Sequence, residues 1–324
     1  MSLVHDVLVN AAMATLLAIA ASAFAQDYPV RPVKLVVPSS PGGGSDFLGR
    51  VLASKLSDGL GQQVVVENRP GASSVIGADA VAKAVPDGYT VLISPAALAI
   101  NPHMYAKMPF DTRRDLAPVS LVVQTGNLLS VHPSLPARSV KELIALARKN
   151  PGKLTSASPG LGGSPHMAAE LLRIMAGIDF LIVSYKGSGP GTIALLSGEV
   201  SFMFSTPPSA IPFVRTGRLR ALGVTTRTRM PGLPEVPTLH EAALPGYEAT
   251  QWFGLLVPAG TPRPVIDRLH QETLRAIRAP EMKQRFAAEG LDPVGSTPEE
   301  FAAFIHAELE KWAKVIQAAG IKAQ

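Results

Sequence analysis

The stretch VKLVVPSSPGGGSDFLGRVLASKL, residues 33–56, indicates the fold. Its first five residues, Val33–Val37, are mostly β-branched or aliphatic, which predicts a buried strand. Residues 38–45 are rich in Pro, Ser and Gly, which predicts a loop. Over residues 46–57 apolar side chains recur at the spacing of a helix. A strand, a short loop and an amphipathic helix form the repeating unit of an α/β sheet.

The same unit recurs along the chain. Further strands are predicted at residues 63–67, 90–93, 128–131, 154–156, 181–184, 200–204, 219–224 and 253–257. Further helices are predicted at residues 74–84, 139–148, 165–175 and 191–196, and three more helices close the chain. Strands that alternate with helices are expected to run parallel, joined by right-handed crossovers.

The length of the chain favours two lobes. A chain of 324 residues is too long for one ordinary core and fits two lobes of roughly 120–150 residues. The pattern restarts near residue 121, and the closing helices are expected to complete the first lobe. We therefore predict an α/β protein with a hinge and a cleft. The first lobe is expected at residues 26–124 and 227–324, and the second at residues 125–226.

The N-terminus predicts export. Residues 7–23 are almost wholly apolar, and Ala23-Phe24-Ala25 has the pattern of a signal-peptidase site. The apolar run is shorter than the about 20 residues that a membrane span requires. No Lys or Arg precedes this run, so a buried N-terminal helix is the alternative. We predict a signal peptide at residues 1–25 and a periplasmic protein that is not inserted in the membrane after cleavage.

Composition excludes several function classes. The formal charge of +5 is spread without a basic block, and the chain has two Trp and five Tyr, which argues against nucleic acid as a partner. The chain has no Cys, which removes disulfides, thiolate catalysis and zinc-thiolate sites. It contains no Gly-x-Ser-x-Gly elbow, no P-loop and no His-Glu-x-x-His motif. We therefore expect no catalytic residues, no metal and no cofactor.

Two glycine-rich loops between a predicted strand and a predicted helix form the main candidate site. In α/β sheets ligands bind beyond the carboxyl ends of strands, where helix N-termini point. The first loop offers N–H groups and hydroxyls from Ser39, Ser40, Gly43, Gly44, Ser45 and Asp46, with Asp46 expected to cap the helix. A plain strand-to-helix turn would explain this composition equally well.

The second loop lies at residues 158–166 and has a similar composition. Its candidate ligand-binding residues are Ser158, Gly160, Gly162, Gly163, Ser164 and His166. Pro165 fits the first turn of a helix, and Ser164 is expected to be its N-cap. His166 could donate a hydrogen bond to a carboxylate, although a half-buried packing histidine is an equally good interpretation.

Three shorter segments add candidates. Lys186, in the segment YKGSGP, could be a cation for the ligand or a solvated surface charge. Small side chains follow two other predicted strands, and these candidates are Ser94, Ala96, Ser205 and Thr206.

An ordered set of motifs resembles one known family. The segments VENRPGA, IGADAVAKAVPDGYTVL, NPHMY, GGSPHMAAELL, YKGSGP and TPEEFAAFI follow the opening stretch in order. From about residue 28 to the C-terminus the chain resembles the Bug-type receptors of tripartite tricarboxylate transporters. The resemblance implies a two-lobed periplasmic binding protein of the Venus-flytrap kind. It also implies a small organic carboxylate as ligand, a membrane permease as partner, and binding of one carboxylate by residues 39–46 and 158–166.

The chain also departs from the pattern of that family. Family members commonly have Asp-Asn where this chain has Ser205-Thr206, often an aromatic residue where it has Ser40, and often a Tyr near Thr155-Ser156. A pocket without the acidic residue would repel a second carboxylate less and bind an amino group less well. We therefore expect a ligand with more negative charge or more bulk than a simple amino acid.

Two rival functions stay open at this point. The first is a secreted hydrolase that uses Ser45 or Ser164 with His166. The second is a sensing protein of the same fold that reports its ligand to a two-component system. We expect a monomer, since nothing in the sequence demands more.

Overall fold

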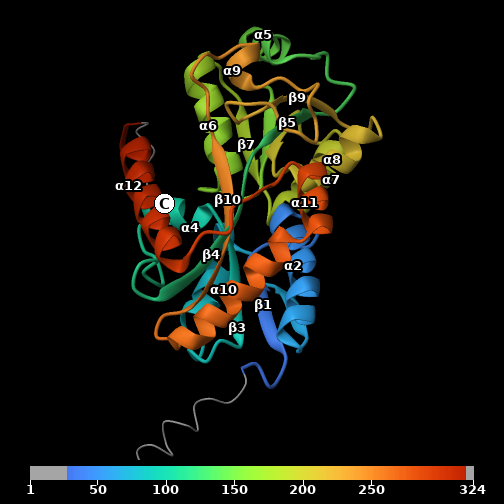
Figure 1. Ribbon diagram of the computed structural model, residues 1–324. Helices are drawn as coiled ribbons and strands as arrows, with labels where there is room; N and C mark the ends of the chain where they lie inside the picture. Colours follow the sequence, from blue (N-terminus) through green and yellow to red (C-terminus); the bar gives the residue numbers. More distant parts are fainter. Residues whose placement is uncertain (1–27, 319–324) are drawn as a thin grey trace, which may run out of the picture.

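The computed structural model describes residues 28–318, and it contains two β-sheets, one in each of two lobes (Figure 1). The first lobe contains β1 (Val33–Val37), β2 (Val64–Asn68), β3 (Thr90–Pro95), β4 (Leu116–Gly126), β10 (Thr250–Pro258) and β11 (Asp292–Pro293). The second contains β5 (Leu128–Val131), β6 (Thr155–Ser158), β7 (Leu181–Ser184), β8 (Phe202–Ser205) and β9 (Arg220–Val224). Their spatial orders are β11-β4-β10-β3-β1-β2 and β7-β6-β8-β5-β9. The predicted signal peptide lies outside the described residues.

Helices cover both faces of each sheet, as the figures show. Those of the first lobe are α2 (Gly44–Leu60), α3 (Val75–Ala82), α4 (Ala97–Ile100), α10 (Arg263–Arg278), α11 (Pro280–Ala288) and α12 (Pro298–Ala318). Those of the second are α5 (Val140–Lys149), α6 (Ser164–Ala176), α7 (Ser188–Leu196), α8 (Pro207–Arg215) and α9 (Leu239–Ala242). Two 3-10 helices lie at Ala72–Ser74 and Asn101–His103. In the described part of the chain, no helix combines the length and hydropathy that a membrane crossing needs.

The inner strands are apolar because both of their faces are buried, whereas the edge strands β2 and β7 are partly exposed. In β1, Leu35 packs into the core on one face of the sheet and Val36 into the core on the other. In β8, Phe202 and Met203 divide in the same way between two cores of the second lobe. Strands covered on both faces have continuous apolar runs without strict alternation, which is why they could be recognised in the sequence.

The prediction that the strands run parallel is wrong for part of each sheet. β1, β2 and β3 are parallel, and so are β6, β7 and β8. However, β10 runs antiparallel to β3 and β4, and β5 runs antiparallel to β8 and β9. Parallel neighbours need a crossover helix between them. The chain instead enters β5 and β10 directly from the other lobe, so these strands start at the cleft where the parallel strands end.

The chain crosses between the sheets at two adjacent places. One crossing joins β4 to β5 at Gly126 and Asn127, and the other joins Ala249 to β10 at Thr250. Thr250 pairs with Gly126, so the crossings lie side by side as one two-stranded ribbon (Figure 1). Residues 230–249 supply side chains to the cores of the second lobe, among them Leu233, Val236, Leu239, Leu244 and Tyr247. The boundaries at residues 124 and 226 stay a prediction, and this packing moves our preferred second boundary to about residue 249.

A buried polar network holds the two crossings together. The backbone N–H of Asn127 donates to Thr225 Oγ1 at 2.7 Å, and Thr225 N donates to Asn127 O at 3.0 Å. The amide Nδ2 of Asn127 donates to Ser164 Oγ at 2.9 Å, and Ser164 Oγ donates to Thr250 O at 2.8 Å. Each buried donor that finds a partner avoids a desolvation cost of about 1–3 kcal/mol.

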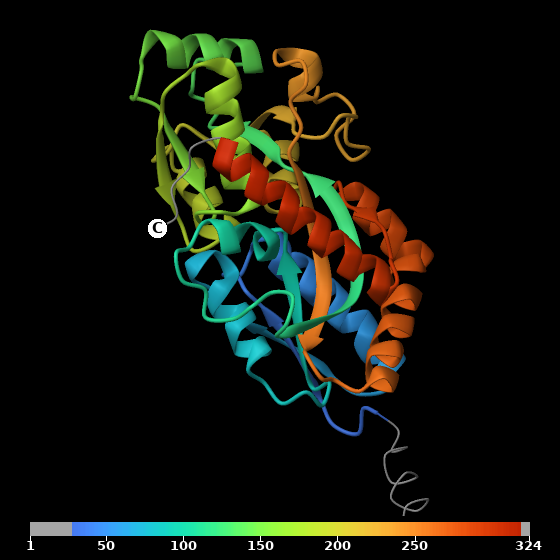
Figure 2. The ribbon, with the colours of Figure 1, turned by 90° about the vertical axis from the view of Figure 1, so that its left-hand side faces the viewer.

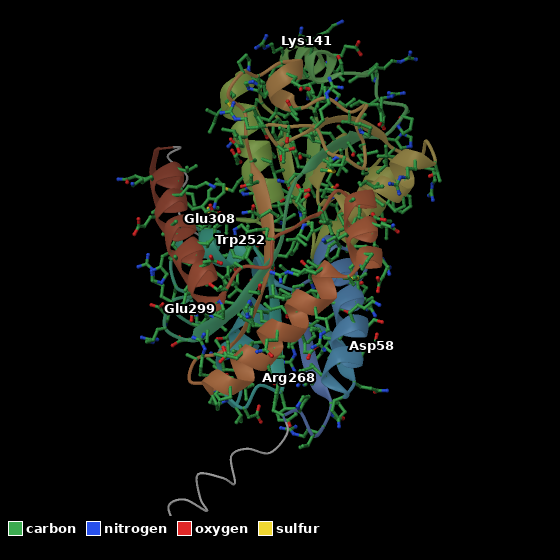
Figure 3. The ribbon with its side chains drawn as sticks, in the orientation of Figure 1. Asp58, Lys141, Trp252, Arg268, Glu299 and Glu308 are labelled. Carbon is green, nitrogen blue, oxygen red and sulfur yellow. The ribbon has the colours of Figure 1, made fainter. Side chains whose placement is uncertain are left out.

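The last helix completes the first lobe. α12 begins at a capping box, in which Thr297 and Glu300 each accept a hydrogen bond from the other's backbone N–H. It packs against β4 and α4, and its path across the sheet is visible in Figure 2. Glu308 lies beside Trp252 of β10 (Figure 3) and accepts hydrogen bonds of 3.1 Å from the indole N–H groups of Trp252 and Trp312. The buried apolar side chains of this helix are part of the core of the first lobe: Phe301, Ile305, Leu309, Trp312 and Ile316.

Candidate functional site

A cavity of about 260 Å³ lies between the lobes, with walls from both. Three helices begin at it, because Gly44 of α2, Gly163 at the N-cap of α6 and Ser188 of α7 all line it. Helix N-termini present unpaired backbone N–H groups and the positive end of the helix dipole. Of the described residues that line the cavity, Lys186 alone carries a formal charge. The cavity is therefore suited to an anion.

The first glycine loop is held by a carboxylate. Gly42 has φ of +80° and donates its backbone N–H to Asp46 Oδ2 at 3.0 Å. Asp46 also accepts hydrogen bonds from Arg50 and Asn68. Burial alone would raise the pKa of Asp46, but the hydrogen bonds from Arg50, Gly42 and Asn68 outweigh it and lower this pKa. Asp46 therefore shapes the loop as an anion and does not face the cavity.

The second glycine loop has the same construction with an imidazole in place of the carboxylate. Gly162 has φ of +76° and donates its backbone N–H to His166 Nδ1 at 3.2 Å. His166 is buried, and Nε2 lies 3.8 Å from Glu170. Burial lowers the pKa of His166, and the neighbouring Glu170 opposes this shift only in part. The ring is therefore a neutral acceptor that holds the loop.

Two predicted helix caps are wrong. The N-caps are Gly43 for α2 and Gly163 for α6, both in extended conformation and without a side-chain cap. Asp46 lies in the first turn, and Ser164 is the first helical residue. The two side chains predicted as caps have other partners. Ser164, one position after Gly163, bonds at the hinge, and Asp46, three positions after Gly43, bonds within its own loop.

The structure brings eight of the predicted binding residues onto the cavity wall: Ser39, Gly43, Gly44, Ser45, Gly160, Gly163, Lys186 and Thr206. Nine others lie off the wall: Ser40, Asp46, Ser94, Ala96, Ser158, Gly162, Ser164, His166 and Ser205. Several of these use their side chains internally. Ser94 Oγ donates to Pro95 O, and Ser158 Oγ donates to Gly160 O. Binding of a ligand by any of them stays a prediction.

The lobes touch across the mouth of the cavity. Ser40 donates from its backbone N–H to Lys186 O at 3.3 Å, and its hydroxyl donates to the same oxygen. A Cβ on Gly44 would lie 2.3 Å from Thr206 Oγ1. A Cβ on Gly189 would lie 2.4 Å from Pro41 O. The chain is therefore in a closed arrangement, in which glycine leaves room for the Thr206 side chain at position 44 and for the Pro41 carbonyl at position 189.

Sequence reasoning missed one wall of the cavity. It includes Ala72, Ser73 and Ser74, which have positive φ values of 45°, 50° and 81°. Tyr105 and Gln251 also line the cavity, and Gln251 Oε1 accepts hydrogen bonds from the backbone N–H groups of Ala96 and Trp252. The turn residues Asn68-Arg69-Pro70-Gly71 were a signal for a loop here. Nothing in the sequence indicated that the loop would reach the second lobe.

Among the described residues, neither a metal-binding cluster nor the rival Ser–His pair is assembled. Across residues 28–318 no three His, Asp or Glu side chains gather in a way that could hold a metal ion. The hydroxyl hydrogen of Ser164 is directed to Thr250 O, and His166 accepts from Gly162. Within that range neither Ser45 nor Ser164 forms a hydrogen bond with His166, so the predicted rival nucleophile–base pair is not assembled.

Comparisons with known proteins agree with this geometry. The sequence profile of the family described as Tripartite tricarboxylate transporter family receptor matches residues 48–321. A Pseudomonas sp. (strain P51) protein from the tcbD-tcbE intergenic region is 42% identical over 290 residues, covering 89% of this chain and 86% of that one. Protein BugT of Bordetella pertussis is 39% identical over 306 residues, covering 94% of both chains.

Solved structures give the same result. The periplasmic binding protein BugD superposes with a TM-score of 0.89 at 32% identity, covering 92% of this chain and all of that one. An R. palustris protein with adipate has a TM-score of 0.89 at 36% identity, over 92% and 100% of the two chains. MatC from Rhodopseudomonas palustris, with bound malate, has a TM-score of 0.83 at 30% identity, over 89% and 100%.

The fold, the closed cleft and the profile match lead to one assignment. The two-lobed α/β architecture predicted from the sequence is confirmed, and so is the resemblance to Bug-type receptors. The chain belongs to the receptor family of the tripartite tricarboxylate transporters and is a solute-binding receptor of that family.

Proposed function

We propose that this protein is a periplasmic receptor that captures a small organic carboxylate by closing its lobes and delivers it to a tripartite tricarboxylate-type permease. One observation carries the proposal. The cavity between the lobes collects three helix N-termini and one lysine, and none of the described residues on its wall is acidic. Charge-assisted hydrogen bonds from N–H groups to a carboxylate contribute about 1.5–3 kcal/mol each, so a few suffice for micromolar affinity.

Lobe closure supplies the mechanism. The first glycine loop belongs to one lobe and the second to the other, so a carboxylate reaches both sets of N–H groups only in the closed form. A ligand that binds one form better shifts the equilibrium toward it. The closed surface is then what the permease recognises. Binding without chemistry fits the receptor family, and we propose that the protein is not an enzyme.

The ligand class follows from the charges on the wall. Relatives bind adipate and malate, both dicarboxylates. On this wall Lys186 could pair with a second carboxylate, whereas an ammonium group would lose its hydration without gaining an acidic partner. We propose a ligand with at least one carboxylate and no amino group. Succinate should therefore bind more tightly than aspartate, and the reverse order in calorimetric titrations would contradict this ligand class.

The test of the function begins with the purified mature protein. Native mass spectrometry before and after denaturation is expected to reveal a co-purifying organic acid, and adding it back should raise the melting temperature. The temperature rises because the ligand binds the folded state alone. A protein that is empty and whose melting temperature ignores adipate, malate and a wide set of other organic acids would refute the proposal.

Delivery to a permease needs a cellular experiment. Deleting the gene for this receptor is expected to abolish high-affinity uptake of the identified acid by intact cells, and restoring the gene should recover uptake. Export can be checked in the same cells, since the mature protein should appear in the periplasmic fraction and lack residues 1–25. Unchanged uptake in the deletion strain would reject the proposed role in transport but not the proposed binding of a carboxylate.

A further inference from the structure

A strained segment forms one wall of the cavity. Ala72, Ser73 and Ser74 all have positive φ, although none of them is glycine. L-residues avoid this region because Cβ approaches the following carbonyl oxygen, and three consecutive instances need support from their surroundings. The segment lies in the first lobe and lines the ligand cavity. Its shape must therefore be maintained by contacts that can be identified.

Asn101 holds the strained segment by a hydrogen bond from outside the cavity. It begins the 3-10 helix Asn101–His103 and is almost fully buried, with 2% of its surface exposed. Its amide Nδ2 donates to Ser73 O at 2.8 Å. This hydrogen bond fixes the peptide between Ser73 and Ser74, in the middle of the strained run. Asn101 itself does not line the cavity.

The second lobe meets the same two groups on closure. A Cβ on Gly160 would lie 3.0 Å from Ser73 Oγ and 3.2 Å from Ser73 Cα. A Cβ on Gly162 would lie 2.8 Å from Asn101 Oδ1. The second glycine loop therefore fits against the strained segment and against its support at once. A relaxed segment would change the surface that this loop contacts.

We propose that Asn101 is a positioning residue for ligand binding. It holds residues 72–74 in the strained shape that forms the cavity wall and that receives Gly160 and Gly162 when the lobes close. This inference rests on the proposed function, because it concerns the same cavity. It adds a residue that touches no ligand and acts through the backbone of Ser73.

The test is a cycle of variants measured by calorimetric titration with adipate and malate. Asn101→Ala removes the hydrogen bond to Ser73 O, and the affinity is expected to fall about tenfold as the segment relaxes. Ala72→Gly removes only an exposed methyl group and makes positive φ inexpensive. The double variant is expected to recover most of the lost affinity. Asn150→Ala, at a distant partly buried asparagine of the second lobe, is the matched control and should bind as the wild type does.

Rescue separates positioning from a general structural role. Damage to the core by Asn101→Ala would lower the melting temperature, and glycine at position 72 would not repair the affinity. Wild-type affinity in Asn101→Ala, or a double variant as weak as Asn101→Ala, would therefore overturn the inference.

Amide hydrogen exchange of the ligand-free protein keeps the inference testable if neither acid binds. Residues 72–75 are expected to exchange faster in Asn101→Ala than in the wild type or in Asn150→Ala. Equal exchange rates would overturn the inference. Faster exchange together with no binding of any acid would support the role of Asn101 and reject the proposed function instead.

Discussion

The two glycine loops share one backbone design and differ in what holds it. In each loop a glycine with φ near +80° donates its N–H to a side chain four residues later. In the first lobe the acceptor is the Asp46 carboxylate, and in the second it is the His166 imidazole. The residue two positions after that glycine also differs, since it is Gly44 in one loop and Ser164 in the other. At this position the loops therefore have different neighbours, because Gly44 faces Thr206 of the opposite lobe and Ser164 is hydrogen-bonded at the hinge.

The largest expected effect is at Gly44. Gly44→Ala should lower the affinity for the identified acid by about a hundredfold, because the new methyl group would overlap Thr206 only in the closed form. The melting temperature of the ligand-free protein should change little, since the open form has room. Titration calorimetry measures the affinity, and small-angle scattering should show a protein that stays open in the presence of ligand.

Two controls define that result. Gly43→Ala is the neighbouring change, with φ of −88° and no atom nearer than 3.6 Å to the added Cβ, so it should still close. Thr206→Gly combined with Gly44→Ala removes the overlap and should restore closure. If Gly44→Ala closes normally in the scattering experiment, then the contact between lobes is not the reason for glycine at this position.

The second effect concerns the hinge. Ser164→Ala removes the hydroxyl between Asn127 and Thr250 and leaves a buried amide without that partner, at a cost of about 1–3 kcal/mol in unfolding free energy. Ser45→Ala, in the first loop, should stay within about 0.5 kcal/mol in stability and change only ligand affinity. Urea unfolding distinguishes the two. Equal destabilisation by both substitutions would show that the hinge hydrogen bonds of Ser164 do not distinguish the two loops in stability.

The third effect is a difference in pH dependence. The folded-state pKa of His166 lies below its ordinary value of 6.5, so the unfolded chain binds the proton more readily. The stability from the neutral ring is present above about pH 6.5 and is lost as the pH falls toward the folded pKa. The loss arises mainly because burial disfavours the charged ring. His166→Asn keeps an acceptor but does not titrate, so its unfolding free energy should vary less between about pH 7.5 and about pH 5.5.

Two charged side chains near the ring also affect the pKa of His166. Glu170 lies 3.8 Å from Nε2 and favours the protonated form, whereas the Arg173 charge disfavours it. Glu170→Gln should therefore make the wild-type pH dependence steeper at the same pH. A His166→Asn variant as pH-sensitive as the wild type would assign the effect to other groups.

The smallest effect is at the carboxylate of the first loop. Asp46→Asn keeps an acceptor for the Gly42 N–H. It loses the charge that pairs with the half-exposed Arg50 and one of the two oxygens that accept from Arg50 and Asn68. The change in unfolding free energy near neutral pH should stay within about 1 kcal/mol. Urea unfolding of Asp46→Asn beside Asp46→Ala is the measurement. A loss as large for the asparagine as for the alanine would show that the charge, not the acceptor, maintains the loop.

Much of the fold could be predicted because its inner strands are buried on both faces. Apolar runs such as Val33–Val37 and Leu128–Val131 are recognisable without knowing their partners. The direction of β5 and β10 was not predictable in this way, since it depends on where the chain crosses between lobes. α8 was missed because its sequence contains Pro207, Pro208 and Pro212, which normally argue against a helix.

The site was predictable only where a motif carried it. The glycine loops were recognisable from their composition, and six of their predicted residues line the cavity. Lys186 and Thr206, predicted from other segments, line it too. Side-chain direction was not encoded locally, so Ser164 and His166 were expected at the ligand and instead hold the hinge and the loop. The conformation of residues 72–74 could not be predicted for a different reason. Its conformation is one that its residues avoid, and it exists because Asn101 supports it.

The paired crossings at Gly126 and Thr250 have a mechanical consequence. Two strands that are hydrogen-bonded to each other bend more easily out of their common plane than they stretch or slide past each other. We therefore expect bending of this ribbon to be the main motion between the lobes. Lys141 lies at the outer end of the second lobe and Asp58 on the side of the first (Figure 3), and both are exposed, so a pair of spin labels there would report the opening of the cleft.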